Sequence, residues 1–287
     1  MVFELKSRRK IFYEIYGDPQ GIPCYFYHGF PGSHVQAKVA HEQAKVHGIQ
    51  IITADRPGLG NSDFDPHRTL QSTIHDIAEL ADFLGHQKFY MIGVSGGAPY
   101  ALASAHYLKD RILALGLVCP LGPLGEKEFR KSFSRAGRTF FSLVETCPWI
   151  IKKIYKRLIL KFDTNPDRYL DRLTRGLSVR DREATRNPEV KMILRSSFQH
   201  SYKQNPENAM VDMEIYVSKW DFKLSDIQVP TYMWHGTDDH IVPYQNSVLI
   251  QQSIPHAEFF TFQGEGHYSV AIEKLPLIMQ KLKAIHQ

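Results

Sequence analysis

A serine flanked by glycines is the residue in this chain best suited to nucleophilic chemistry. Ser95 lies in the run Gly93–Gly97, which follows the apolar stretch Phe89–Ile92 and precedes an alanine-rich segment that begins at Pro99. This order predicts a strand, a sharp turn and a helix. A serine on such a turn has a strained backbone, and small residues two before it and two and three after it are needed to avoid clashes. The pattern predicts a nucleophile elbow.

The acid that would support this serine follows a later strand. A serine hydroxyl is a weak nucleophile near neutral pH, so the chemistry requires a carboxylate and a histidine in the chain order Ser, Asp or Glu, His. A glycine-rich turn alone is weak evidence, and these partners therefore decide the interpretation. The strand predicted at 231–235 runs into a turn that contains Asp238 and Asp239. Asp239 is the favoured acid and Asp238 the alternative, which would otherwise cap a helix predicted near Pro243.

The base is selected by its position, because the chain contains fourteen histidines. The strand predicted at 258–262 ends in a glycine-containing loop, and His267 lies on that loop just before the last predicted helix. Of the histidines, only His267 follows the strand after the acid at the end where α/β sheets carry their functional loops. We therefore predict His267 as the general base.

An early loop supplies the third requirement, hydrogen-bond donors for an oxyanion. The aromatic strand predicted at 23–27 ends in His28-Gly29-Phe30-Pro31-Gly32. In such sites one donor is the backbone N–H of the residue after the nucleophile, and the other comes from a loop of this kind. We predict the backbone N–H groups of Phe30 and Gly96 as the donors. The alternative is a plain strand-to-helix turn.

Jointly, these motifs resemble the α/β-hydrolase superfamily, in its serine-nucleophile, esterase-like branch with a helical cap. The segments that carry the resemblance are His28–Gly32, Asp55–Ser62, Gly93–Gly97, His235–Pro243 and Gly266–His267. It implies that Asp55–Ser62 is a loop beside the site with no catalytic role. Haloalkane dehalogenases and epoxide hydrolases place aspartate at the elbow, so the serine argues against both. The Gly-x-Pro-Gly loop also resembles that of proline iminopeptidases, although the elbow here lacks their tryptophan.

The remaining pattern predicts an α/β fold with a mostly parallel, doubly wound sheet. Strands are predicted near residues 11–16, 23–27, 49–54, 89–92, 112–119, 231–235 and 258–262, and helices at 36–47, 70–84, 99–108, 244–253 and 270–285. Between about 120 and 225 the pattern is helical with no clear strand. We therefore predict a discontinuous hydrolase core, 1–120 and 226–287, with a helical cap inserted at 121–225.

The predicted cap is basic and amphipathic. Residues 126–161 contain ten Lys or Arg and three Glu. Trp149–Leu160 places an apolar stripe opposite a basic one. We expect the apolar faces of the cap helices, including parts of Phe140–Phe141 and of Trp149–Leu160, to close over Ser95 and form most of an apolar acyl pocket. The basic face would lie in solvent, or contact an anionic substrate group or a membrane surface.

Composition narrows the classes of protein further. The chain has 287 residues, 43% hydrophobic, and a formal net charge of +5. Three cysteines, Cys24, Cys119 and Cys147, form no C-x-x-C pair, which favours free thiols and a reducing compartment. Neither a secretory signal nor a membrane span is recognisable, so we expect a cytoplasmic protein. We expect no cofactor and no metal, and no nucleic-acid partner because no recognition motif accompanies the charge.

The favoured function is hydrolysis of a carboxylic ester or a related small acyl substrate through an acyl-enzyme on Ser95. The same three residues could run acyl transfer, or thioester, peptide or carbon–carbon bond hydrolysis, the peptidase being of the proline iminopeptidase type. A ligand-binding receptor or scaffold on the same fold is the alternative outside the enzymes. The sequence selects neither a substrate within this class nor an oligomeric state.

Overall fold

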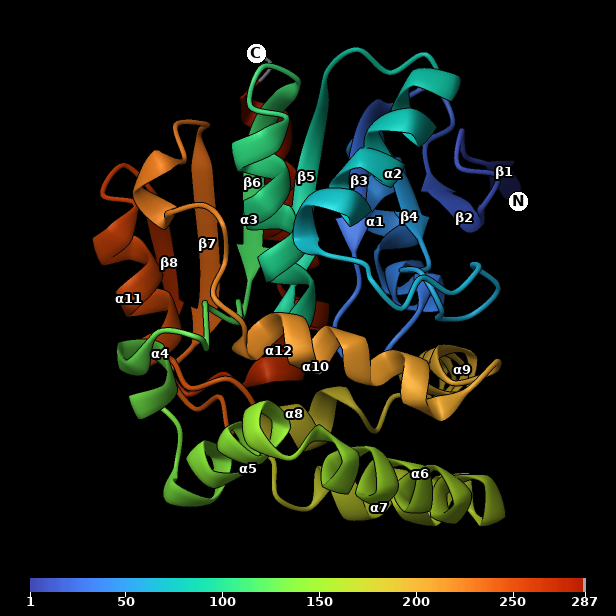
Figure 1. Cartoon of the computed structure of the whole chain (residues 1–287). Helices are drawn as coiled ribbons and strands as arrows, with labels where there is room; N and C mark the ends of the chain where they lie inside the picture. The colour runs from blue at the N-terminus through green and yellow to red at the C-terminus, as the bar shows by residue number, and fades with distance from the viewer. Residues whose placement is uncertain (286–287) are drawn as a thin grey trace.

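An eight-stranded sheet, flanked by helices on both faces, forms the centre of the computed structural model, which describes residues 1–285 (Figure 1). The strands are β1 (Val2–Glu4), β2 (Lys10–Gly17), β3 (Ile22–Tyr27), β4 (Ile49–Ala54), β5 (Phe89–Val94), β6 (Ile112–Val118), β7 (Thr231–Gly236) and β8 (Glu258–Phe262). Their order is β1-β2-β4-β3-β5-β6-β7-β8. Strand β2 pairs antiparallel with β1 and β4, and the other neighbours are parallel. The predicted mostly parallel sheet is confirmed.

Helices bury the sheet from both sides. The flanking helices are η1 (His34–Ala40), α1 (His41–Val46), α2 (Leu70–Phe83), α3 (Ala98–Tyr107), α11 (Gln245–Ser253), α12 (His267–Glu273) and α13 (Leu275–Ala284). Apolar residues of α2, α3 and α11 form one buried cluster, and those of η1, α1, α12 and α13 form another. Strand β5 lies between them, and its residues 89–93 are buried, as expected for a strand covered on both faces.

Three details differ from the sequence expectations. The helix predicted at 36–47 is a 3₁₀ helix followed by a short α-helix, η1 and α1. The helix predicted at 270–285 starts earlier and is divided into α12 and α13, with Pro276 in the first turn of α13, where its missing N–H is harmless. Strand β1 was not predicted because three residues are too short for a periodic pattern.

A layer of helices connects β6 to β7 and lies across one end of the sheet (Figure 1). These elements are α4 (Lys127–Lys131), α5 (Arg135–Thr146), α6 (Pro148–Thr164), α7 (Pro166–Thr174), α8 (Val179–Ala184), α9 (Pro188–Ser201), η3 (Pro206–Ala209), α10 (Met210–Val217) and η4 (Leu224–Asp226). We refer to α4–α10 as the cap. The division into 1–120, 121–225 and 226–287 stays a proposal. Within residues 1–285, none of the helices has the length and apolar character needed to cross a bilayer.

Candidate active site

Ser95 lies where β5 turns sharply into a helix. It opens the short 3₁₀ helix η2 (Ser95–Gly97) and has a φ of +53°, in the left-handed region that non-glycine residues rarely adopt. A Cβ atom added at Gly97 would lie 2.1 Å from the carbonyl oxygen of Tyr27, and one added at Gly93 would lie 2.6 Å from Cβ of Ala101. The turn therefore needs small residues at both positions. Such strain persists where the surrounding packing imposes it, and it is typical of functional positions.

The structure brings His267 and Asp239 together beside this turn. His267 is the first residue of α12, and its Nδ1 lies 2.6 Å from Oδ2 of Asp239, in the loop after β7. Both side chains are buried. The carboxylate of Asp238 pairs instead with the exposed His240 at 2.9 Å. Asp238 does not cap the following helix either, because α11 begins with no side-chain cap. Because a carboxylate accepts, Nδ1 of His267 donates, which leaves Nε2 free to take a proton.

The electrostatics of this pair favour an ionised acid and a basic imidazole. Burial raises the pKa of Asp239, but His267 and His235 outweigh that effect and hold the pKa well below its usual range. Burial lowers the pKa of His267, but the carboxylates of Asp239 and Asp181 outweigh it, so the net change is upward. Asp239 is therefore a carboxylate at neutral pH, and the imidazole gains basicity from it.

Asp239 is itself held by several groups. Its Oδ1 accepts the backbone N–H groups of Ile241 and Val242 at 2.8 and 2.9 Å. Its Oδ2 lies 2.9 Å from Nε2 of His235, whose Nδ1 lies 2.7 Å from Oγ of Ser247. A single tautomer satisfies both contacts, with Nε2–H donating to Asp239 and Nδ1 accepting from Ser247. His235 therefore positions the carboxylate of Asp239, a contact that the sequence pattern did not indicate.

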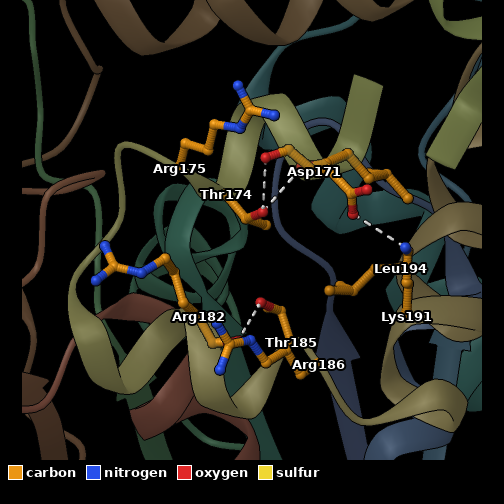
Figure 2. A pocket seen from close by; sticks show the side chains of 9 residues that line it. Asp171, Thr174, Arg175, Arg182, Thr185, Arg186, Lys191 and Leu194 are labelled. Carbon is orange, nitrogen blue, oxygen red and sulfur yellow. Dashed lines mark hydrogen bonds and ion pairs between the residues drawn. The ribbon is translucent and has the colours of Figure 1, made fainter. Parts of the chain in front are cut away.

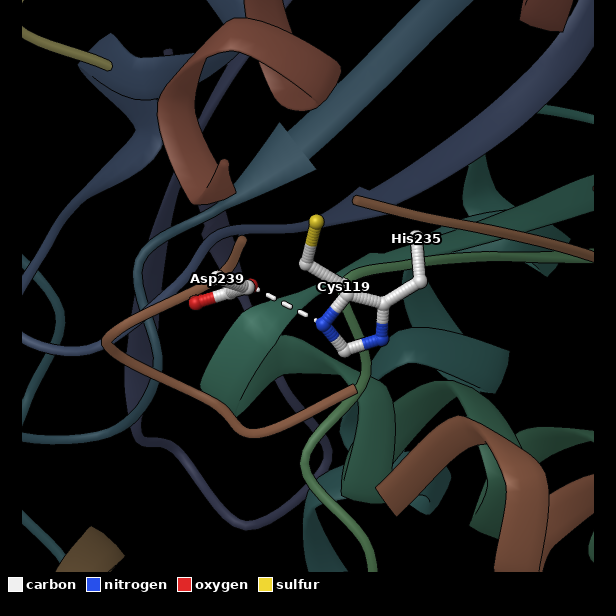
Figure 3. Close-up of side chains that lie close together, drawn as sticks. All are labelled: Cys119, His235 and Asp239. Carbon is white, nitrogen blue, oxygen red and sulfur yellow. Dashed lines mark hydrogen bonds and ion pairs between the residues drawn. The ribbon is translucent and has the colours of Figure 1, made fainter. Parts of the chain in front are cut away.

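Cys119, His235 and Asp239 each place one donor atom within 4.8 Å of the others (Figure 3). Burial, followed by the charge of Asp239, raises the pKa of Cys119 well above its usual value, and its Sγ donates to the carbonyl of His267 at 3.7 Å. The Asp239 oxygen is already shared by two imidazoles. In these contacts His235 supports the carboxylate of Asp239, and Cys119 binds the backbone of His267.

The helix that carries His267 begins on a carboxylate supplied by the cap. Asp181 of α8 is fully buried and accepts the backbone N–H groups of His267, Tyr268 and Ser269 at 3.0, 2.7 and 2.9 Å. A Cβ atom at Gly266 would lie 2.4 Å from Cγ of Asp181, so only glycine allows this approach. The first N–H groups of a helix lack intrahelical partners, and a negative charge there also interacts favourably with the helix dipole. Helix α8 thereby fixes the backbone of the predicted base.

The predicted oxyanion loop lies against Ser95. The backbone N–H of Gly29 donates to Oε1 of Gln36 at 2.7 Å, which fixes the start of the loop. A Cβ atom built on Gly29 would lie 3.4 Å from Cβ of Ser95, and one built on Gly96 would lie 2.9 Å from Cβ of Phe30. Phe30 and Gly96, the two predicted donors, are therefore neighbours beside Ser95. Their role in binding an oxyanion stays a prediction.

A buried ion-pair network ties this loop to the cap. Arg56, in the loop after β4, donates from Nη1 to the carbonyl of His28 at 2.7 Å and from Nη2 to Asp212 of α10 at 2.7 Å. Asp212 also accepts from the hydroxyl of Tyr100 at 2.7 Å and pairs with Arg68 at 2.6 Å. The two arginines overcome the effect of burial and hold the pKa of Asp212 well below its usual range. The loop after β4, Asp55–Ser62, therefore contacts the predicted oxyanion loop and lies beside the site, as the resemblance implies.

Ser95 and His267 line the same small cavity, with a volume of about 70 Å³. Its other lining residues are Phe26, Gly29, Phe30, Pro31, Gln36, Val39, Val94, Leu194, Tyr268, Ala271 and Ile272. The lining is mostly apolar, and among residues 1–285 it contains no carboxylate. The cap contributes Leu194 of α9 to it.

The prediction that the cap helices, including parts of Phe140–Phe141 and of Trp149–Leu160, form most of this pocket is wrong, because the cap contributes only Leu194 to the lining among residues 1–285. No residue of these two ranges lines the cavity, and Trp149 is 66% exposed. Helix α6 buries Ile151 and Ile159 within the cap instead, and its ring contact with the site is Tyr155, 6.2 Å from the ring of Phe30. The periodicity identified an amphipathic helix, but it did not indicate which neighbour would cover its apolar side.

A larger hollow of about 270 Å³ lies in the cap and shares Leu194 with the cavity at Ser95 (Figure 2). Its lining contains four basic residues and one acidic residue. The lining residues are Leu170, Asp171, Thr174, Arg175, Arg182, Thr185, Arg186, Lys191 and Leu194. The carboxylate of Asp171 pairs with Lys191 at 3.0 Å. The cap side adjoining the cavity is therefore positively charged.

Comparison with known proteins agrees with this architecture. The sequence model of the alpha/beta hydrolase family matches residues 25–274. The chain belongs to this family. A proline iminopeptidase of Lactobacillus helveticus is 25% identical over 272 residues, which cover 90% of this chain and 88% of that protein. The 2-hydroxy-6-oxononadienedioate/2-hydroxy-6-oxononatrienedioate hydrolase of Comamonas testosteroni is 26% identical, over 77% of this chain and 72% of its own.

Among solved structures, the esterase EaEST of Exiguobacterium antarcticum is similar in fold to this alpha/beta hydrolase. The TM-score is 0.73 at 18% sequence identity, and the match covers 100% of this chain and 99% of the esterase. At this identity the likeness supports the fold alone. The match of the family model over residues 25–274 establishes the hydrolase family.

Proposed function

We propose that this protein is a serine hydrolase that cleaves a carboxylic ester or a related small acyl substrate. Oγ of Ser95 attacks the carbonyl carbon while its proton passes to Nε2 of His267, and Asp239 orients and stabilises the resulting imidazolium. The backbone N–H groups of Phe30 and Gly96 receive the oxyanion. The imidazolium then protonates the leaving alcohol. Water, activated by His267, releases the acyl group from Ser95.

One observation carries this proposal. Ser95, in its strained left-handed conformation, shares a cavity with His267, whose Nδ1 lies 2.6 Å from the buried carboxylate of Asp239. A nucleophile, a base and an orienting acid in this sequence of contacts form the arrangement that acyl transfer requires. A binding protein on the same fold would need none of these three residues, so the arrangement favours an enzyme.

The cavity favours an uncharged, short acyl group over an aminoacyl group. The lining offers Phe30, Val39 and Leu194 as apolar contacts, and among residues 1–285 no carboxylate reaches it. An α-ammonium group would therefore enter without a counter-charge, which costs free energy in an apolar site. For this reason we place ester hydrolysis ahead of the peptidase activity named for the iminopeptidase relatives. Acyl transfer, and thioester and carbon–carbon bond hydrolysis, remain alternatives that substrates can distinguish.

The test is a substrate panel on purified wild-type and Ser95→Ala protein. The panel holds p-nitrophenyl acetate, butyrate and octanoate, a thioester, a 1,5-diketone and proline p-nitroanilide. We expect the short esters to be the best substrates, and Ser95→Ala to lower turnover by about 10⁴ to 10⁶. Ser142→Ala, at an exposed serine of α5, is the matched control and should keep wild-type rates. More than a few per cent activity in Ser95→Ala would contradict the proposal.

A further inference from the structure

The outer face of α6 combines exposed apolar side chains with lysines. Trp149, Lys153, Lys156 and Leu160 follow one another at spacings of four, three and four residues, which places them on one stripe of the helix. Trp149 is 66% exposed and Leu160 is 60% exposed. Both lysines are exposed as well. The stripe therefore presents two large apolar side chains to solvent with two cations between them.

This stripe is not needed for packing within the cap. The opposite side of α6 already provides the buried contacts, because Ile151, Ile159 and Phe162 are at most 3% exposed. Phe162 packs on the rings of Phe198 and Tyr202, at centroid distances of 4.5 and 6.1 Å. Helix α6 therefore has a buried apolar side and a second, outward stripe that contains apolar residues.

The acidic groups of α6 and α7 are engaged on the side that faces α9. The two helices hold seven Lys or Arg and three Asp. Asp163 accepts the hydroxyl of Tyr202 at 2.6 Å, Asp171 pairs with Lys191 at 3.0 Å, and Asp167 pairs with Arg195 at 3.4 Å. Six cations have no acidic partner within residues 1–285: Lys153, Lys156, Arg157, Lys161, Arg168 and Arg172. The outward face is consequently positive.

A hollow between the two helices adds a place for a phosphate. Its volume is about 270 Å³, and its lining consists of Lys161, Thr164, Asn165, Arg168, Tyr169 and Arg172. Three cations and several neutral hydrogen-bonding groups line it, and within residues 1–285 no carboxylate does. This composition matches the charge and hydrogen-bonding capacity of a phosphate group.

We propose that the outer face of α6 and α7 docks on an anionic phospholipid bilayer. Trp149 and Leu160 enter the interfacial region, Lys153 and Lys156 lie at the headgroups, and the hollow between the helices holds a lipid phosphate. Tryptophan beside lysine on one helix face is typical of helices that lie on a membrane, and an anionic leaflet attracts the unpaired cations. Both helices lie at the side of the cap remote from the sheet, where a flat surface can approach them (Figure 1).

Trp149 provides a direct readout of this contact. The chain has three tryptophans, and Trp220 and Trp234 are only 8% and 1% exposed. Fluorescence quenching by brominated lipid therefore reports on Trp149. With vesicles of phosphatidylcholine and phosphatidylglycerol, we expect cosedimentation and quenching at low salt, and much weaker binding at high salt or with pure phosphatidylcholine. Trp149→Ala should weaken binding and abolish the quenching.

Charge reversal on the stripe separates docking from general basicity. The double variant Lys153→Glu/Lys156→Glu should bind at least about 30-fold more weakly, because each lysine near an anionic surface contributes roughly 1 kcal/mol. The matched control is Lys45→Glu/Lys109→Glu, which makes the same charge change at exposed lysines of the core and should bind like the wild type. Melting curves of both variants check that they are folded.

Four outcomes would overturn the proposal. They are an absence of binding to phosphatidylglycerol vesicles at low salt, equal losses in the two double variants, sedimentation without quenching of Trp149, and binding to RNA or to an acidic protein with none to vesicles. None of them depends on the hydrolase activity, because vesicle binding and quenching are measured without substrate.

Discussion

Replacing Asp181 with asparagine tests whether the cap positions the base. The carboxylate accepts from Tyr268 and Ser269 through Oδ1 and from His267 through Oδ2. An asparagine can keep its carbonyl oxygen on the first two N–H groups, but its amide nitrogen then faces the N–H of His267. One hydrogen bond to a charged acceptor is lost at a fully buried site, which costs about 1.5–3 kcal/mol of folding free energy.

The same change alters the proton affinity of the base. Burial lowers the pKa of His267, but the carboxylates of Asp239 and Asp181 raise it by more, so the net change is upward. A base acts in its neutral form, so kcat/KM increases as the pH rises through this pKa. Without the charge of Asp181 the pKa decreases, and the acidic limb of the profile should move to lower pH. Displacement of the imidazole should also lower the plateau of kcat/KM, by up to about 100-fold.

The assay is the pH dependence of kcat/KM for a short p-nitrophenyl ester, with melting curves to confirm folding. The control is Asp171→Asn, which removes the same charge from the cap at a carboxylate that pairs with Lys191. A merely structural role for Asp181 would lower stability and leave the acidic limb in place. An unchanged acidic limb and an unchanged plateau in Asp181→Asn would together refute the reasoning.

Three other tests, which use five substitutions, address separate parts of the site and the cap. Asp239→Asn should lower kcat by about 10⁴, because the imidazole loses its oriented tautomer. Asp238→Asn should keep a kcat within a few-fold of the wild type in the same ester assay. The reverse order would identify Asp238 as the acid. Asp212→Asn leaves buried arginines without a counter-charge and should cost about 3–5 kcal/mol in urea unfolding, and a cost below about 1 kcal/mol would contradict the network. Leu194→Ala should raise the relative rates on longer acyl chains, while Trp149→Ala should leave these ratios unchanged; identical ratios in both variants would contradict the assigned lining.

Much of the fold could be predicted because its signals are local. The buried strand β5, the glycines around Ser95 and the loop that carries Asp239 each lie in a short continuous stretch. Parallel strands end at the same edge of a sheet, so the order of the motifs along the chain also predicted their proximity. Asp239 and His267 are close together for the same reason, because each follows a parallel strand at that edge of the sheet.

The cap could not be predicted in the same way. Asp181 binds backbone N–H groups that lie 86 to 88 residues away in the chain. Because almost every residue type has a backbone N–H group, the sequence does not indicate which of these groups a distant carboxylate will bind. The helix expected at Trp149–Leu160 is present in α6, but its apolar residues lie on two sides, and the sequence does not reveal which side packs inward. The contact of Leu194 with the cavity depends on how α9 crosses the sheet edge, which local periodicity does not specify.

Covalent labelling of Ser95 tests the central claim most directly. The protein is incubated with a fluorophosphonate, digested and analysed by mass spectrometry. Our account predicts one adduct per chain on Ser95, none in Ser95→Ala, and much slower labelling in His267→Gln, since the hydroxyl then lacks its base. An adduct at another residue, or equal labelling rates in the wild type and His267→Gln, would contradict the proposed mechanism.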